Sequence, residues 1–101
     1  GFILIKSQLN SNKLFDLKMI LKKSFALGVR NLLIEGGDKV TKNLIKNKLI
    51  DIFYLFQSPK ILPKSKINQN FSSFKILNKN YKKKYRLTSR LIKDNITIYK
   101  R

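Results

Sequence analysis

A diglycine turn stands between a short apolar run and a helical pattern. Residues 32–34 are Leu-Leu-Ile, Glu35 follows, and Gly36 and Gly37 come directly before apolar residues that recur at helical spacing. Glycine lets the backbone turn sharply and approach a ligand closely, and the start of a helix leaves N–H groups without partners. The sequence therefore predicts a strand, a turn and a helix whose start is open to an anion such as a phosphate group.

Two further apolar runs occur besides the one at residues 32–34. Residues 2–5 and 52–56 are continuous apolar stretches, and their lack of alternation indicates strands that are covered on both faces. Helical patterns separate the three runs. Strand–helix–strand units in sequence imply parallel neighbours joined by right-handed crossovers. We therefore predict an α/β fold with parallel β-α-β units.

Each predicted helix has recognisable ends. Asp16 is a candidate N-cap for the first helix, and Gly28 suits the left-handed residue at its end. The second helix is expected from Asp38 to about Asn47. Its expected inward-facing residues are Val40, Leu44 and Ile45.

The last third of the chain has a different character. Residues 63–73 are polar and loop-like, and residues 75–77, 85–92 and 96–99 have the composition of strands. Residues 93–95 (Lys-Asp-Asn) suit a turn, so the last two strands are expected to pair antiparallel. The predicted fold is a three-layer α/β sheet that finishes in antiparallel strands.

The diglycine turn and the segments after it stand in a specific order. Glu-Gly-Gly is followed by a helix, by Leu-Ile-Asp at 49–51, by an apolar run at 53–56 and by Pro-Lys-Ile-Leu at 59–62. This ordered set resembles the RibD-like reductase domains of riboflavin biosynthesis, whose fold is like that of dihydrofolate reductase. The family's pattern begins well before Gly1, so the resemblance implies that residues 1–101 are the C-terminal half of such a domain. For Asp51 we favour a hydrogen-bonding role at the start of a strand over contact with a ligand.

The resemblance implies an enzyme that uses NADPH. The full domain reduces the ribosylamino chain of 5-amino-6-(5-phosphoribosylamino)uracil to a ribitylamino chain, and we expect the present chain to be inactive alone. By resemblance, Glu35 contacts the substrate, while the turn and the helix start hold the cofactor phosphates. The expected cofactor-binding residues are Gly36, Gly37, Asp38, Lys39, Val40 and Thr41. No catalytic residue is assigned, because hydride transfer needs mainly positioning and the nicotinamide supplies the chemistry.

Several positions depart from the family's pattern, and one departure is that Pro63 and Lys64 stand where glycines usually follow Pro-Lys-Ile-Leu. Asp38 places a negative charge where a phosphate group would dock, and Lys39 and Lys42 stand close enough in sequence to offset it. No glycine ends the second helix, which leaves Asn47 or Lys48 to adopt the left-handed conformation at some energetic cost.

The formal net charge of +18 raises a second possibility, a small nucleic-acid-binding module, because such a charge attracts polyanions. Lysines occur in every segment, however, so we favour compositional bias and do not expect nucleic acid as a partner. The basic–aromatic cluster at 81–86 would alternate between the two faces of a strand. A pterin or folate reductase of the same fold is a further alternative, which the sequence does not separate from the aminouracil enzyme.

The chain contains neither cysteine nor histidine. Disulfides, thiolate catalysis, histidine acid–base catalysis and ordinary zinc sites are therefore excluded within it, and its five scattered acids do not suggest a carboxylate metal cage. No apolar run approaches the length of a membrane span, and no signal peptide is recognisable. We therefore expect no metal and no membrane partner, and a cytoplasmic location. By resemblance we also expect a homodimer, and in a longer chain the missing first half of the domain and an upstream deaminase domain.

Overall fold

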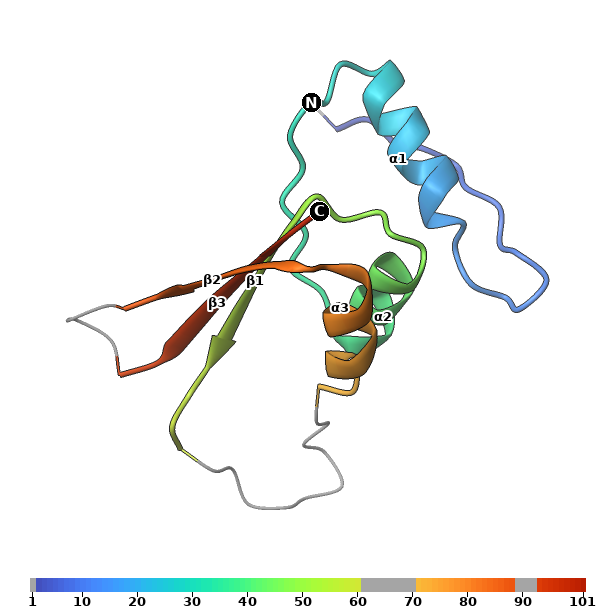
Figure 1. The fold of residues 1–101 in the computed structure, drawn as a ribbon. Coiled ribbons are helices and arrows are strands. Elements are labelled where there is room, and N and C mark those ends of the chain that lie inside the picture. Colours follow the sequence, from blue (N-terminus) through green and yellow to red (C-terminus); the bar gives the residue numbers. More distant parts are fainter. Residues whose placement is uncertain (1, 61–70, 89–92) are drawn as a thin grey trace. The chain divides into compact units, whose positions relative to one another are not determined.

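The computed structural model describes residues 2–60, 71–88 and 93–101, and it divides the chain into two compact units. The first unit is Gly1–Glu35 and the second is Gly36–Arg101. Within the described ranges, the first unit contains one helix, and the second contains two helices and a sheet (Figure 1). Among the described residues, no helix has the length and the apolar character to cross a membrane.

The first unit contains one helix, α1 (Leu17–Ala26). Asp16 is its N-cap, and the Asp16 carboxylate accepts a hydrogen bond of 3.1 Å from the backbone N–H of Met19. Gly28 follows the helix with a φ of 95°, which is the left-handed conformation expected there. Both predicted ends of this helix are therefore confirmed. None of its residues is buried.

The prediction of strands at residues 2–5 and 32–34 is wrong for this structure. Both runs are irregular, and Phe2 and Leu33 are 102% and 82% exposed. A strand is stabilised by hydrogen bonds to a neighbouring strand, and the described part of the first unit supplies no such neighbour to either run. All described strand pairs are antiparallel, so the expected parallel β-α-β units are not present among them.

The second unit is a three-stranded antiparallel sheet with two helices. Its elements in chain order are α2 (Asp38–Lys46), β1 (Ile52–Gln57), α3 (Phe74–Asn80), β2 (Lys83–Leu87) and β3 (Asn95–Lys100). The strand order is β1-β3-β2, and Ile98 of β3 lies opposite Tyr54 of β1 and Tyr85 of β2. The strand predicted at 52–56 and the antiparallel pairing of the last two strands are thus confirmed.

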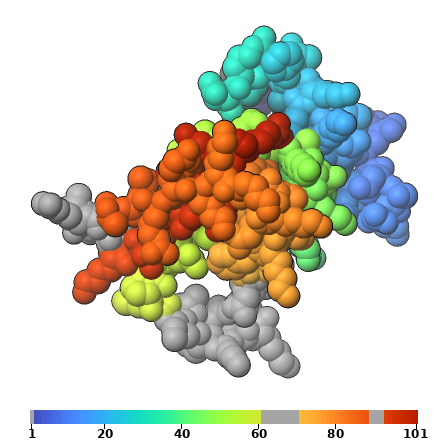
Figure 2. Space-filling view, in the orientation of Figure 1, coloured from blue at the N-terminus to red at the C-terminus, as the bar shows by residue number. Residues whose placement is uncertain are grey.

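One face of the sheet packs against α2 and α3, so the unit has two layers where three were expected (Figure 1). The core joins Ile45 of α2 and Leu77 of α3 to Leu55 and Tyr99 of the sheet, with Tyr81 between α3 and β2. The side chains of α3, β2 and β3 form one continuous mass in the space-filling view (Figure 2). This small core fixes the helix starts relative to the sheet.

Residues 75–77 belong to helix α3, which corrects the strand expected there. A short apolar run suits a strand or a buried helix equally well, and its surroundings decide between them. Here Phe74 and Leu77 are three residues apart, so a helix turns both toward the core, where Leu77 is fully buried.

Helix α2 follows the sequence prediction closely. It begins at Asp38, and Leu44 and Ile45 are buried, whereas Val40 is 41% exposed and does not face inward as expected. After the helix, Lys48 has a φ of 55° while Asn47 keeps a negative φ of −88°. Lys48 is therefore the residue that takes the left-handed conformation in place of a glycine. Most of the loop predicted at 63–73 and part of the strand predicted at 85–92 lie outside the described residues.

Candidate functional site

The start of α2 is an open helix N-terminus. Gly37 is the N-cap, in extended conformation, and no side chain caps the helix there. The first helical hydrogen bond runs from the N–H of Thr41 to the carbonyl of Gly37 at 3.1 Å. The N–H groups of Asp38, Lys39 and Val40 precede it and have no intrahelical acceptor. They are the backbone donors that a helix start offers to an anion.

The position beside Gly37 is clear of neighbouring atoms. A Cβ atom added to Gly37 would meet nothing within 4 Å, and the φ of Gly37 is −69°, which any residue can adopt. The glycine is therefore not required by the backbone conformation of the turn. Its effect is to leave the first turn of α2 without a side chain in front of it, which is what close approach of a phosphate group needs.

The hydroxyl of Thr41 turns back toward the diglycine turn. Its Oγ1 donates to the carbonyl of Gly36 at 3.5 Å, a long and weak contact. For the Thr41 hydroxyl to donate to a bound cofactor, this weak contact would have to break, which costs little.

The carboxylate of Asp38 is held by Ser72. Oδ1 accepts from the backbone N–H of Ser72 at 3.2 Å, and Oδ2 accepts from the Ser72 hydroxyl at 2.8 Å. The sequence predicts that the Asp38 carboxylate competes with a docked anion. In the structure both carboxylate oxygens are engaged by a residue on the segment before α3, so the charge is partly satisfied away from the helix amides.

The remaining predicted residues are exposed. Glu35 is the last residue of the first unit, whereas the other six predicted residues lie consecutively at the start of the second. Lys39 and Lys42 are exposed on α2 and add positive charge to its first two turns. Together with the partial positive charge of the helix start, they favour an anion at this end of α2.

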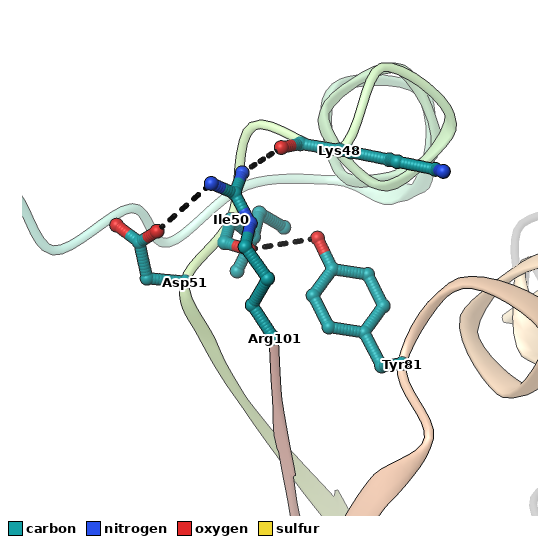
Figure 3. Close-up of polar contacts among 5 residues, drawn as sticks. All are labelled: Lys48, Ile50, Asp51, Tyr81 and Arg101. Atoms are coloured by element: carbon teal, nitrogen blue, oxygen red, sulfur yellow. Dashed lines mark hydrogen bonds and ion pairs between the residues drawn. The ribbon is translucent and has the colours of Figure 1, made fainter.

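A second polar cluster lies at the end of the sheet where β1 begins and β3 ends (Figure 3). Tyr81 donates its hydroxyl to the carbonyl of Ile50 at 2.8 Å, and Arg101 pairs with Asp51 at 3.5 Å and donates to the carbonyl of Lys48. The backbone N–H of Arg101 also donates to the carbonyl of Asp51 at 3.0 Å. Asp51 therefore has the strand-start hydrogen-bonding role that the sequence favoured. Burial raises the pKa of Tyr81 above its usual value.

Ser72, Tyr81 and Arg101 are the residues that sequence reasoning missed. Their contacts join positions between 31 and 53 residues apart. No local pattern marks such a contact, because the sequence next to a serine, a tyrosine or an arginine does not identify a partner so far along the chain. Only the packing of α2 on α3 and the antiparallel sheet bring these partners together.

The basic–aromatic cluster at 81–86 is divided by β2, as the strand alternation predicted. Lys84 lies 5.6 Å from the ring of Tyr99, on the helix-covered side of the sheet, whereas Lys100 lies 5.6 Å from the ring of Tyr85 on the opposite side. The cations of this segment therefore do not form a single face.

Two further features of the described residues concern other kinds of site. Residues 2–60, 71–88 and 93–101 contain no group of three acids, histidines or cysteines that could hold a metal ion. The first unit has an open apolar groove of about 460 Å³, which contains none of the predicted site residues. Its lining residues are Ile3, Leu4, Ile5, Lys6, Lys23, Ala26 and Leu27.

Comparison with protein families gives one finding for this chain. The family model described as the RibD C-terminal domain matches residues 3–93. The matched region contains the diglycine turn, both helices of the second unit, and strands β1 and β2. Comparison with curated proteins gives no match, and comparison with solved structures gives none either.

Proposed function

Because the chain belongs to the RibD C-terminal domain family, we propose that it is part of an NADPH-dependent reductase of riboflavin biosynthesis. The family points to a reductase of this pathway. The finer proposal is that the full domain reduces 5-amino-6-(5-phosphoribosylamino)uracil to its ribitylamino product. The reduction adds a hydride from NADPH and a proton to the opened ribose chain, which becomes a linear ribityl chain, and NADP⁺ is released.

The open N-terminus of α2 is the observation that carries this proposal. A dinucleotide brings a diphosphate, and three backbone N–H groups, two lysines and the space in front of Gly37 suit that group. The residues proposed to hold it are Gly36, Gly37, Asp38, Lys39, Val40 and Thr41. When bound, NADPH supplies the hydride.

Glu35 is proposed to bind the substrate. A carboxylate accepts hydrogen bonds from hydroxyl and ring N–H groups, both of which an aminouracil ribotide has. Glu35 directly precedes the proposed phosphate-binding turn. The five acids are scattered along the sequence and form no recognisable pattern for proton transfer, so no catalytic acid is proposed within these residues.

We propose that the complete domain contains parallel strands, which do not occur among the residues that the structure describes. Residues 2–5 and 32–34 have the composition of buried strands, and exposed apolar runs of this kind are rarely left unpartnered in a finished domain. We therefore propose a dihydrofolate-reductase-like sheet that is completed by an N-terminal half. A homodimer, an upstream deaminase domain and a cytoplasmic location are further parts of this proposal.

Fusion to an upstream half tests the function. The chain is joined to the first half of a reductase domain from the same family, and NADPH oxidation is followed by nicotinamide absorbance with the aminouracil ribotide as substrate. The expected result is oxidation by the fusion and none by the isolated chain. Gly37→Val places a branched side chain in front of the helix amides and is expected to weaken NADPH binding. A folded fusion that oxidises no NADPH would contradict the proposal.

A further inference from the structure

Positive charge is locally uncompensated around α3 and β2. Residues 52–93 contain no aspartate or glutamate, although lysine and arginine recur throughout them. The nearest acids are Asp51 and Asp94, one at each end of this region. The cations that lie in α3, in β2 and in the link between them are Lys75, Lys79, Lys82, Lys83, Lys84 and Arg86.

Within residues 2–60, 71–88 and 93–101, no ion pair neutralises these six cations. All five acids of the chain lie in those ranges, and the ion pair formed there joins Asp51 to Arg101 at 3.5 Å. The Asp38 carboxylate is held by Ser72 instead. All six cationic residues are exposed. Their charge therefore faces water and is available to an anionic partner.

The strand β2 brings half of these cations to one edge of the sheet. The strand order is β1-β3-β2, so β2 has β3 on one side and no other described strand on its outer side. Lys84 and Arg86 lie on the helix-covered face and Lys83 lies on the opposite face. Both rows nevertheless border the same outer edge, and the long side chains of lysine and arginine can extend past it. Residues on one face of a strand are about 7 Å apart, so these cations form a line along the edge.

The end of α3 continues this line of charge. Lys79 lies in the last turn of α3, and Lys82 lies in the short link between α3 and β2. Lys79, Lys82 and Lys83 are therefore grouped around the corner where the helix gives way to the strand. In Figure 2, α3 and β2 (orange tones) form one continuous stretch of surface.

An exposed aromatic ring stands among the cations of β2. Tyr85 is 52% exposed, and Lys100 Nζ lies 5.6 Å from the centre of its ring. Cations that contact phosphates, together with an aromatic ring on which a base can stack, are the means by which proteins bind single-stranded nucleic acid. A polyanion without bases, such as inorganic polyphosphate, would use the cations alone.

We propose that the outer edge of β2 and the end of α3 bind single-stranded nucleic acid. Lys83, Lys84 and Arg86 contact phosphate groups along the strand, and Tyr85 stacks on a base. The even spread of lysines along the chain favours compositional bias, whereas the acid-free region and its unpaired cations favour a local anion site. Phosphate contacts and stacking carry little sequence information, so binding with little sequence preference is expected. This binding is separate from the proposed reductase function and does not depend on it.

Two variants of equal net charge separate a local site from the charge of the whole chain. Binding of the full 101-residue chain to a fluorescent oligouridylate of about 20 nucleotides is measured by fluorescence anisotropy over a range of salt concentrations. The edge variant carries Lys83→Gln, Lys84→Gln and Arg86→Gln. The control variant removes three exposed cations from α1 and α2, with Lys18→Gln, Lys22→Gln and Lys46→Gln. Circular dichroism establishes that each variant has folded. The single variants Arg86→Glu and Lys22→Glu give the same comparison, should a triple variant not fold.

The edge variant is expected to bind oligouridylate at least about tenfold more weakly than the unmodified chain. Its slope of log K against log salt should be smaller by about two, because each phosphate contact to a single strand contributes about 0.7. The control variant should stay within about threefold of the unmodified chain. Equal weakening of both variants would assign the binding to the net charge of the whole chain and overturn the inference, as would no binding by the unmodified chain.

Tyr85→Leu distinguishes nucleic acid from other polyanions. The variant loses the stacking ring and keeps every cation, so its affinity for oligouridylate should fall about fivefold while its affinity for inorganic polyphosphate stays the same. Unchanged binding of oligouridylate by Tyr85→Leu would show that the edge binds polyanions through charge alone, and would overturn its assignment to single-stranded nucleic acid.

Discussion

The carboxylate of Asp38 accepts two hydrogen bonds from Ser72, one from its backbone N–H and one from its hydroxyl. These bonds join the start of α2 to the segment that leads into α3. A free aspartate in the first turn of a helix tends to turn toward the helix amides, where the partial positive charge lies. Ser72 competes with those amides for the carboxylate. The contact thereby reduces the effect of the one negative side chain at a helix start that otherwise suits an anion.

Loss of the Ser72 hydroxyl is expected to weaken cofactor binding. In Ser72→Ala the Asp38 carboxylate is freer to interact with the start of α2, so we expect the dissociation constant for NADPH to rise about two- to fivefold at low salt. Fluorescence titration of the fused domain with NADPH measures this change. The double variant Asp38→Asn with Ser72→Ala should recover the affinity, because no carboxylate then remains to compete. Unchanged affinity in Ser72→Ala, or no recovery in the double variant, would contradict this role.

Removal of the Tyr81 hydroxyl is expected to destabilise the second unit. Tyr81 is 1% exposed, and its hydroxyl donates to the carbonyl of Ile50, so Tyr81→Phe leaves that acceptor without its partner. The expected loss in the free energy of unfolding is about 1–2 kcal/mol. Urea unfolding at neutral pH measures it. Tyr85→Phe is the matched control, since Tyr85 is 52% exposed and its substitution should have almost no effect.

The same tyrosine predicts a loss of stability at alkaline pH. Burial raises the pKa of Tyr81 above the ordinary value of 10.0, so the folded chain holds this proton more tightly than the unfolded chain does. The neutral hydroxyl of Tyr81 therefore makes its full contribution to the free energy of unfolding below pH 10.0. This contribution is lost as the pH rises through the pKa of Tyr81 in the folded chain. Unfolding curves at increasing pH test this, and Tyr81→Phe should lose that part of the pH dependence. An equal decline in both proteins would assign the effect to other groups.

Local signals predicted the parts of this structure that depend on local geometry. Asp16, Gly28 and the start of α2 at Asp38 were identified correctly, because a cap or a left-handed residue needs only its sequence neighbours. The strand at β1 was also found, since a dense apolar run of that length suits a strand in most surroundings. Six of the seven predicted site residues lie at the start of α2, where the diglycine pattern placed them.

Elements that depend on distant partners were not predictable in the same way. The run at 75–77 becomes part of a helix because α2 and the sheet offer Leu77 a buried position, which the sequence of the run does not encode. The apolar runs at 2–5 and 32–34 have the composition of strands but lack a neighbouring strand in the described structure. Ser72 acquires its contact with Asp38 only through the packing of α3 beside α2.

Replacement of Lys48 by glycine is expected to stabilise the folded chain. Lys48 has a φ of 55°, which costs a residue with a Cβ atom about 1–2 kcal/mol, while glycine loses part of that gain through its greater freedom when unfolded. Lys48→Gly should therefore raise the free energy of unfolding by about 0.5–1 kcal/mol, as measured by urea unfolding. The control is Asn47→Gly, whose φ of −88° gives glycine no advantage, so it should not stabilise. The Lys48 carbonyl that accepts from Arg101 belongs to the backbone and remains in the variant.

Substitution of Glu35 separates the proposed substrate site from the proposed cofactor site. Glu35→Gln keeps the size of the side chain but removes the charge and one acceptor, so a substrate hydroxyl or ring N–H loses a charge-assisted hydrogen bond. In the fused domain we expect kcat/KM for the aminouracil ribotide to fall about 10- to 100-fold, while the dissociation constant for NADPH stays the same. Steady-state kinetics and NADPH titration give the two quantities separately. The matched variant Gly37→Val should show the opposite pattern, with NADPH binding weakened, because the added side chain stands before the helix amides. If Glu35→Gln weakened NADPH binding and left kcat/KM at saturating NADPH unchanged, the carboxylate would belong to the cofactor site and its assignment to the substrate would be wrong.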